Sequence, residues 1–428
     1  MSLVGRSFLH ASDIHFGFPL GALDGCRQLD ATMRAELVEQ MQGAFDNLID
    51  LAIREDVLFV VLAGDLYDSA EAQDNQQGRF RSGLVRLADH GIRVFMVHGN
   101  HDPLRSSFRP RRPLPDNVHI FNADTPHEFE VPAGDEQVHV AGVSFGSRSV
   151  PENLAQRFHS LPREHARWRV GVLHTSLAGS AEHDPYAPCS VDDLRNAPVG
   201  YWALGHIHLR SDRNSLGPGR WWAYPGNLQG RSFKPAECHP KGALLVRLAH
   251  DGFEAPEFRA CDTVRFASVD IDISEAGGVE ESYELAADAL AQHASAADGR
   301  RLVARVRLVG RHAQHAEFRR LASAGSYLDN LLDSFHDELG TTVVAGAVSE
   351  VRPAVDPAEI RKGESLLATA LQRLDQLSDD ELLALATSNV ARTAAEVLRK
   401  PGVSVERLRL VAERALIEAI HDEGAARQ

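Results

Sequence analysis

The stretch Leu58-Phe59-Val60-Val61-Leu62 leads through Ala63-Gly64 to the carboxylate of Asp65. An apolar run of this length is typical of a strand that is buried on both faces of its sheet. Three more runs of this kind precede polar residues, and a shorter run, Phe8-Leu9, precedes a further polar cluster. The three runs are Val94-Phe95-Met96-Val97, Val170-Gly171-Val172-Leu173 and Tyr201-Trp202-Ala203-Leu204. The pattern predicts an α/β protein whose buried strands carry polar residues at their carboxyl ends.

The polar residues after these runs form the candidate site. They are Asp13-Ile14-His15, Gly64-Asp65, Gly99-Asn100-His101-Asp102, the single His174 and Gly205-His206-Ile207-His208. Open α/β sheets build their sites at the carboxyl ends of strands. Any one of these clusters alone is more often a turn, a hydrogen-bonded pair or a core histidine than a ligand. All of them in series predict a two-metal site. Carboxylates, imidazoles and one amide, without a thiolate, suit Mn, Fe or Zn.

The order of these clusters resembles that of the calcineurin-like metallophosphoesterases. The wider sequence is similar to the nuclease subunit of bacterial SbcC–SbcD, and within that group to the YhaO type of DNA repair exonuclease. The resemblance covers about the first 250 of the 428 residues. Besides the clusters, it rests on Leu9 to Gly17, Leu66-Tyr67-Asp68, His183 to Cys189, Tyr201 to His208, Tyr224 to Arg231 and Pro240-Lys241-Gly242.

The resemblance implies a role for each candidate residue. One metal would be held by Asp13, His15, Asp65 and His208, and the other by Asp65, Asn100, His174 and His206. Two cations about 3.5–4 Å apart need an anionic bridge, which Asp65 supplies, and they activate the attacking water. His101 and Asp102 complete the catalytic set. His101 either protonates the leaving oxygen or supports the ligands, and the role preferred for Asp102 is to orient or cap the loop.

The resemblance also implies the cofactors and partners. The cofactors would be two divalent metal ions, Mn in the first place, with Fe, Co or Zn as alternatives. The partners would be DNA and a coiled-coil ATPase subunit of the SbcC or YhaN kind. Members of the family often form homodimers, although no segment of this sequence identifies a dimer interface.

One position departs from the family pattern. Some archaeal and eukaryotic relatives carry a histidine three residues after the bridging Asp, where this chain has Asp68. In the family that histidine is tied to substrate handling and exonuclease activity, so the balance between exonuclease and endonuclease activity stays open. Two roles remain for Asp68, namely contact with a metal-bound water and closure of the turn.

The net charge argues against a protein that grips DNA on its own. With a net charge of −15, the chain lacks the excess of Lys and Arg with which such a protein binds phosphates. A local exception, directly after the Gly-Asn-His-Asp turn, consists of Arg105, Arg109, Arg111 and Arg112. These arginines either guide a phosphate backbone into the site or belong to a solvated loop.

The remaining composition is that of an ordinary cytoplasmic protein. With 43% hydrophobic and 25% charged residues, the chain has the profile of a globular protein. No stretch approaches roughly 18 consecutive apolar residues, so neither a transmembrane helix nor a membrane partner is expected. The first ligand follows the N-terminus too closely for a signal peptide. The four cysteines are widely spaced, which favours reduced structural thiols.

Three parts are predicted along the chain. Residues 1–262 form the catalytic domain, in which helices over 32–54 and 76–90 alternate with strands. The alternation predicts a layered α/β sandwich, which the resemblance makes the four-layer calcineurin-like fold, with loops over 108–115 and 180–198. Residues 263–352 form a small α+β domain with strands over 264–273, 302–308 and 341–348. By resemblance this domain caps the site and contacts DNA.

The last part, residues 353–428, is predicted to be helical. Leu366, Leu367, Leu371 and Leu374 mark one apolar face, and Leu408, Val411, Ala415 and Ile417 mark another. These faces either pack on the chain's own core or, as the resemblance implies, bind the ATPase partner. In the middle part, Arg305 and Arg307 are secondary DNA candidates, with solvated strand positions as the alternative.

Two classes of function fit the sequence. The first is a metal-dependent DNA exonuclease or endonuclease subunit that works with an ATPase. The second is a stand-alone phosphoesterase that acts on a small diester or nucleotide. The discriminating feature is the tail, because a small-molecule hydrolase has no need of residues 263–428.

Overall fold

The chain is described by a computed structural model that covers residues 3–68, 74–105, 113–133, 136–177, 186–382, 406, 408–413 and 415–417. It folds into two compact units. The first unit comprises Met1–Ser268 with Ala294–Val303, and the second comprises Val269–His293 with Ala304–Gln428. Every residue of the predicted metal site belongs to the first unit. The predicted division into three parts stays a prediction.

Two sheets build the first unit. The seven-stranded sheet has the order β12-β11-β1-β2-β3-β4, with β13 paired to β11, and the six-stranded sheet has the order β5-β6-β7-β8-β10-β9. Strands β1 to β4 are parallel, as are β6, β7, β8 and β10. The strand bounds are β1 Ser7–Ala11, β2 Phe59–Ala63, β3 Arg93–Val97, β4 Val118–Ile120, β5 His127–Ala133, β6 Glu136–Val143, β7 Arg169–His174, β8 Tyr201–Gly205, β9 Ser211–Gly217, β10 Arg220–Tyr224, β11 Gly242–Ala249, β12 Gly252–Phe253 and β13 Glu257–Ala260.

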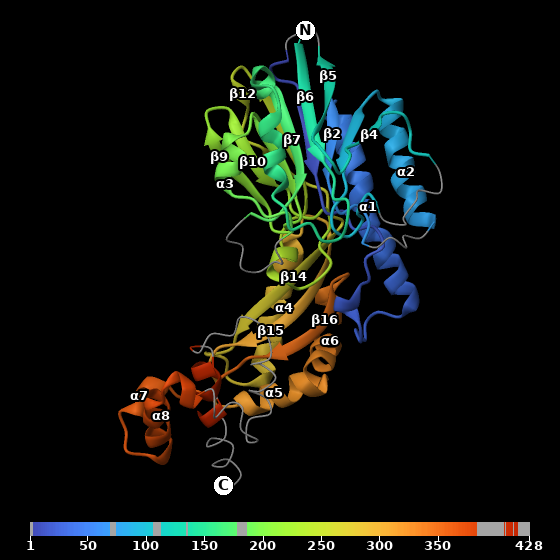
Figure 1. Cartoon of the computed structure of the whole chain (residues 1–428). Helices are drawn as coiled ribbons and strands as arrows, with labels where there is room; N and C mark the ends of the chain where they lie inside the picture. The colour runs from blue at the N-terminus through green and yellow to red at the C-terminus, as the bar shows by residue number, and fades with distance from the viewer. Residues whose placement is uncertain are drawn as a thin grey trace. The chain divides into compact units, whose positions relative to one another are not determined.

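The core of this unit lies in three apolar clusters that separate four layers. Helices α1 (Ala31–Arg54) and α2 (Asp74–Asp89) pack on one face of the first sheet (Figure 1). The two sheets pack on each other through the second cluster. The outer face of the second sheet is covered by the 3-10 helix Leu154–Ser160 and by α3 (Val191–Asn196). The predicted calcineurin-like sandwich is thus confirmed.

The apolar runs are buried on both faces, as the sequence pattern predicts. In β2, Val60 and Leu62 face the helices, whereas Phe59, Val61 and Ala63 face the second sheet. A parallel strand inside a layered α/β protein has no solvated face, so its residues do not alternate between apolar and polar. Burial on both faces therefore explains why the apolar runs in the sequence are continuous.

The two predicted helices of the first unit begin and end near the expected residues. At the start of α1, the Asp30 side chain accepts a hydrogen bond from the Met33 N–H at 2.8 Å, which satisfies a free N-terminal donor. Helix α2 ends just before Gly91, whose φ of 69° lies in the left-handed region.

A third sheet has the order β14-β15-β16, with β14 Val264–Asp272, β15 Arg301–Val309 and β16 Val343–Ser349. These three strands match the strands that the sequence predicts. The further helices are α4 Val279–Ala296, α5 His315–Ala324, α6 Ser326–Leu339, α7 Pro357–Arg361 and α8 Leu366–Gln376. Among the described residues, no helix is long and apolar enough to cross a membrane.

One local prediction is wrong, and another holds only in part. The predicted loop 180–198 contains α3, because Ser190 and Asp193 form a capping box and Leu194 is buried. The predicted leucine face of α8 holds only in part, since Leu366 is 79% exposed. Leu367 and Leu371 instead pack on Ile417 of the same chain, and Leu374 packs on Leu382 and Leu408. These leucines serve the chain's own packing, and Ala415 of the second predicted face is exposed.

Candidate metal centre

All seven predicted metal ligands meet at the carboxyl ends of the two sheets. Asp13, Asp65 and Asn100 follow strands of the first sheet, and His174, His206 and His208 lie at or after strand ends of the second. Parallel strands bring their carboxyl ends to one edge, and the face-to-face packing brings both edges together. Three groups of possible ligand atoms form, each within 4.8 Å. The first is Asp13, His15 and His208, the second is Asp65, His174 and His206, and the third is His15, Asp65 and His101.

The backbone at this edge is held in a strained conformation. Seven non-glycine residues in the described part of the chain have positive φ, and four of them belong to the site. These four are Asp13 (52°), His15 (51°), Asp65 (51°) and His206 (101°). Positive φ is unfavourable for L-residues and persists where the surrounding structure enforces it, often at functional sites. The strain marks the same residues that the sequence pattern selects.

Glycines allow the ligands to approach one another. A Cβ on Gly99 would overlap Asp65 Oδ1 and would lie 2.8 Å from His174 Nε2. A Cβ on Gly64 would lie 2.5 Å from His174 Nδ1, and the φ of Gly64 is 93°. Both positions therefore exclude a side chain.

The first ligand group contains two histidines whose inner nitrogens face each other. Nε2 of His15 lies 3.1 Å from Nε2 of His208, and Asp13 Oδ1 lies 3.9 and 3.7 Å from these two atoms. The outer nitrogens contact carboxylates, with His208 Nδ1 donating to Glu237 Oε1 at 2.8 Å and His15 Nδ1 lying 3.2 Å from Asp68 Oδ1. Burial, followed by the charge of a nearby arginine, lowers the pKa of His15. The Asp68 carboxylate beside Nδ1 favours the tautomer with its proton on this outer nitrogen.

This arrangement fits a cation. A proton on each outer nitrogen leaves a lone pair on each inner nitrogen, and these lone pairs point at each other beside the Asp13 carboxylate. Such a cluster of acceptors is repulsive unless a positive charge lies among them. Metal-bound histidines usually have their outer N–H oriented by a carboxylate or a carbonyl, as these two do.

The second group also fits a cation. His174 Nδ1 donates to the carbonyl of Ala63 at 2.9 Å, which leaves Nε2 facing Asn100 Oδ1 at 3.0 Å and Asp65 Oδ2 at 3.4 Å. Asp65 Oδ2 also lies 3.8 Å from His15 Nε2 of the first group. Its other oxygen, Oδ1, accepts the backbone N–H of His101 at 3.0 Å. One oxygen of Asp65 thus stands between the two groups, where a bridging ligand would stand.

The two residues predicted as catalytic differ in their surroundings. The His101 side chain is 38% exposed, and its Nδ1 donates to the Asp68 carbonyl at 2.9 Å. Asp102 is 1% exposed, and its oxygens accept the backbone N–H groups of Gly99 at 2.9 Å and Leu66 at 3.0 Å. These contacts clamp the loop that carries Asn100 and favour the orienting role for Asp102.

Asp68 contacts protein groups rather than open solvent. Its Oδ1 lies 3.2 Å from His15 Nδ1 and 2.8 Å from Nη1 of Arg231. Burial acts to raise the pKa of this carboxyl, but the contacts with His15 and Arg231 lower it to about 2. Asp68 therefore orients a candidate ligand from outside the metal group.

Several residues at the site were not singled out as site residues from the sequence. A pocket beside the ligands is lined by Asp65, Asp68, Asn100, His101, His206 and His208, and also by Pro19, Gly21, Ala22, Tyr186, Arg231, Ser232, Lys234, Ala236 and Glu237. Glu237 lies in the short 3-10 helix Pro235–Glu237, and burial would raise its pKa if His208 and Arg231 did not lower it to about 2. No sequence signal ties this helix to the ligands.

Of the four predicted arginines after the Gly-Asn-His-Asp turn, the structure describes Arg105, which does not line the metal pocket. Arg105 is exposed and forms an ion pair with Asp124. Arg109, Arg111 and Arg112 lie outside the described residues. Arg307 is paired with Asp270 and Glu350, both at 2.9 Å.

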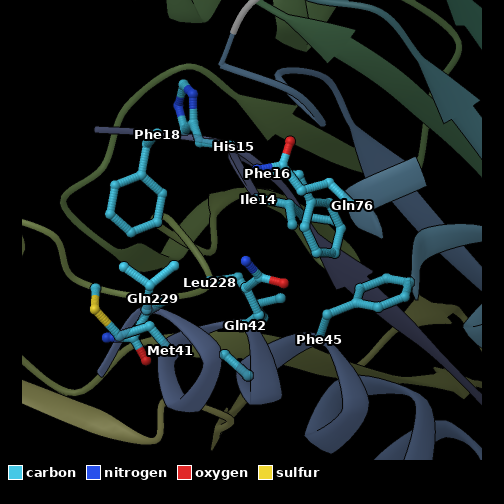
Figure 2. A pocket seen from close by; sticks show the side chains of 13 residues that line it. Ile14, His15, Phe16, Phe18, Met41, Gln42, Phe45, Gln76, Leu228 and Gln229 are labelled. Atoms are coloured by element: carbon cyan, nitrogen blue, oxygen red, sulfur yellow. The ribbon is translucent and has the colours of Figure 1, made fainter. Parts of the chain in front are cut away.

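A second pocket lies on the side of His15 that faces α1. Figure 2 shows Met41, Gln42 and Phe45 of α1 on one side of it and His15, Phe16 and Phe18 on the other. Apart from His15, its lining side chains carry no charged group within the described chain. The pocket is lined mainly by apolar side chains, together with the amides of Gln42, Gln76 and Gln229.

The charges of the second group predict a pH-dependent metal affinity. Burial opposes protonation of His174, but Asp65 raises the pKa of His174 to about 9, and the pKa of Asp65 is held well below its usual range. Below pH 9 the metal-free site therefore carries a proton that a metal must displace. Titration calorimetry with Mn²⁺ should show proton release and an affinity that rises about tenfold per pH unit between pH 7 and 8. An affinity that is independent of pH and of the buffer's ionisation heat would contradict this.

Comparison with known proteins places the geometry in a family. Residues 6–210 match the calcineurin-like phosphoesterase family, and residues 266–349 match the middle domain of metallophosphoesterase YhaO. The chain is 34% identical over 287 residues to the uncharacterized metallophosphoesterase YhaO of Bacillus subtilis, a match that covers 67% of this chain and 68% of that protein.

Two further relatives are more distant. The DNA double-strand break repair protein Mre11 of Thermoplasma acidophilum is 27% identical over 220 residues, 49% of this chain and 53% of that protein. The SbcD component of the nuclease SbcCD of Bacillus subtilis is 27% identical over 231 residues, 47% of this chain and 56% of that protein. The chain belongs to the calcineurin-like metallophosphoesterases and is homologous to YhaO and to the SbcD and Mre11 nucleases.

Proposed function

We propose that this chain is the nuclease subunit of a DNA repair complex and that it hydrolyses phosphodiester bonds in DNA with two divalent metal ions, Mn²⁺ in the first place. The observation that carries the proposal is the convergence of two acceptor groups on Asp65 Oδ2, which lies 3.8 Å from His15 Nε2 and 3.4 Å from His174 Nε2. The names of the Mre11 and SbcCD relatives support DNA as the substrate.

The ligand sets follow the two groups. Asp13, His15, Asp65 and His208 would hold one metal, and Asp65, Asn100, His174 and His206 would hold the other. When bound, two divalent cations lower the pKa of a water and offset the negative charge on the phosphoryl oxygens. Asp65 would supply the anionic bridge, and the strained backbone would hold the ligands in place before the substrate binds.

His101 is proposed to move the proton to the leaving oxygen. Because Nδ1 is held by the Asp68 carbonyl, Nε2 is the nitrogen that is left for the substrate side of the ring. The ring lines the same pocket as Asp65, Asn100 and His206. In its imidazolium form, with a proton on each nitrogen, a histidine so placed can donate the Nε2 proton to a departing alkoxide and return to the neutral ring with its proton on Nδ1.

The remaining parts are assigned to substrate and partner. We propose that residues 263–352 cap the site and contact DNA, and that residues 353–428 bind a coiled-coil ATPase of the SbcC or YhaN kind in the cytoplasm. The acidic net charge of −15 supports a partner that supplies most of the DNA-binding affinity.

The experiment compares end-labelled single- and double-stranded DNA with the small diester bis-p-nitrophenyl phosphate, each with Mn²⁺ and with EDTA. We expect Mn²⁺-dependent hydrolysis of the diester and cleavage of DNA, which the ATPase partner enhances. Hydrolysis of the small diester with intact DNA, also in the presence of the ATPase, would reject the nuclease and favour the small-substrate alternative.

A further inference from the structure

Arg231 lies between the two carboxylates that orient the facing histidines of the first ligand group. Its Nη1 is 2.8 Å from Asp68 Oδ1, and its Nε is 3.6 Å from Glu237 Oε1. The Arg231 side chain is 19% exposed, and those of Asp68 and Glu237 are 20% and 6% exposed. Asp68 lies 163 positions before Arg231 in the sequence, whereas Glu237 follows Arg231 closely, and the three residues meet at the edge of the metal pocket.

Each of the two carboxylates holds the outer nitrogen of a histidine. Asp68 Oδ1 lies 3.2 Å from His15 Nδ1, and Glu237 Oε1 accepts from His208 Nδ1 at 2.8 Å. The inner nitrogens of these histidines are 3.1 Å apart. We propose that Arg231 is a positioning residue, a single guanidinium that fixes both carboxylates and through them both histidines of one metal site.

The guanidinium suits this role better than another cation would. Its planar fork presents several N–H groups in fixed directions, so it can contact two carboxylates at once, whereas an ammonium is a compact point charge. Its position is secured further by the ring of Phe18, whose centroid lies 5.6 Å from the guanidinium carbon. Without the guanidinium, Asp68 would lose its 2.8 Å hydrogen bond and both carboxylates would lose a neighbouring positive charge. Glu237 Oε2 would keep the hydrogen bonds from Asn227 Nδ2 and from the backbone N–H of residue 231.

A positioning role and simple electrostatics predict opposite changes in Mn²⁺ affinity when Arg231 is removed. By Coulomb attraction alone, removal of a positive charge near a metal site should strengthen cation binding. If Arg231 positions the two carboxylates, its removal should weaken binding, because loss of an outer partner of a ligating histidine costs about 10- to 100-fold in metal affinity. The direction of the change therefore separates the two explanations.

The test measures Mn²⁺ binding without nucleic acid, by titration calorimetry and electron paramagnetic resonance on the full chain. Arg231→Met should weaken one of two Mn²⁺ sites about 10- to 100-fold, and Arg231→Lys should recover part of the loss. Arg79→Met is the matched control, because Arg79 also contacts two carboxylates, those of Glu39 and Asp46, and lies outside the metal pocket. This control should leave binding unchanged or slightly tighter. Repeating the titration in His208→Ala and His174→Ala backgrounds assigns the weakened site, which should be the one that His208 serves.

Unchanged or tighter Mn²⁺ binding in Arg231→Met would overturn the proposal, as would equal weakening of both sites. A raised KM for bis-p-nitrophenyl phosphate with normal Mn²⁺ binding would mean that Arg231 contacts substrate instead. If Arg231→Met does not fold, Mn²⁺ binding by Arg231→Lys decides between the two explanations, since lysine keeps the positive charge but lacks the planar fork of N–H groups. The inference rests on the metal-binding part of the proposed function. Because the readout is Mn²⁺ alone, a failure to cleave DNA would defeat the nuclease and leave this inference standing.

Discussion

Replacement of Asp65 by asparagine is expected to lower phosphodiester hydrolysis about 1,000-fold and to abolish the gain in stability on adding Mn²⁺. Asp65 Oδ2 is the atom that faces both ligand groups, at 3.8 Å from His15 Nε2 and 3.4 Å from His174 Nε2. An amide keeps the shape and an acceptor oxygen but removes the negative charge that two neighbouring cations require. Asparagine also tolerates the φ of 51° at this position, so the backbone should not change.

The measurement is the melting temperature with and without Mn²⁺, together with the rate of diester hydrolysis. At a Mn²⁺ concentration 100 times the Kd, wild-type protein should gain about 2.7 kcal/mol, and Asp65→Asn should gain little of this. Without metal, the variant should melt below the wild-type temperature, because the folded protein stabilises the charged form of Asp65 beside His174 and asparagine lacks that charge. Asp50→Asn is the control, since Asp50 pairs with Arg86 on the helical face. An Asp65→Asn protein with normal Mn²⁺ stabilisation would exclude Asp65 as the bridge.

The convergence of the candidate ligands could be predicted from the sequence because the positions of their clusters follow from local rules. Asp13, Asp65, Asn100 and His206 each come within a few residues of a strand end, and continuous apolar runs reveal such strands. The carboxyl edge of a parallel sheet then brings the residues together, however far apart they lie in the chain. The same runs predicted a layered α/β core, because runs without alternation imply strands that are buried on both faces.

The residues that orient the ligands could not be predicted in this way. Glu237 contacts His208 from a short 3-10 helix, and Arg231 reaches Asp68 across 163 positions of sequence. Neither residue has a periodic neighbour or a strand end that would mark it, because an outer contact depends on tertiary packing alone. Helix α3 is different, since Ser190 and Asp193 carry a capping signal that is visible in the sequence.

His101→Ala tests whether the reaction depends on a proton donor, and its effect should depend on the leaving group. The variant should cleave DNA about 100- to 10,000-fold more slowly, because the departing alkoxide needs a proton. Bis-p-nitrophenyl phosphate should be affected much less, since p-nitrophenolate leaves without protonation. Mn²⁺ affinity should be unchanged, because the contact that steadies Asp65 comes from the backbone N–H of residue 101 at 3.0 Å, which alanine retains.

The control for this variant is His90→Ala, which removes a histidine just beyond the end of α2 and outside the metal pocket. Equal losses on DNA and on the small diester would show that His101 supports the site without acting as the acid. A loss of Mn²⁺ affinity would indicate that His101 is a metal ligand. Its position allows this, because its ring nitrogen lies within 4.8 Å of the possible ligand atoms of His15 and Asp65. The proton transfer is assigned to His101 only if activity is lost selectively on DNA, which has the poorer leaving group, and both Mn²⁺ sites stay intact. No other change removes a proton donor while leaving the metals in place.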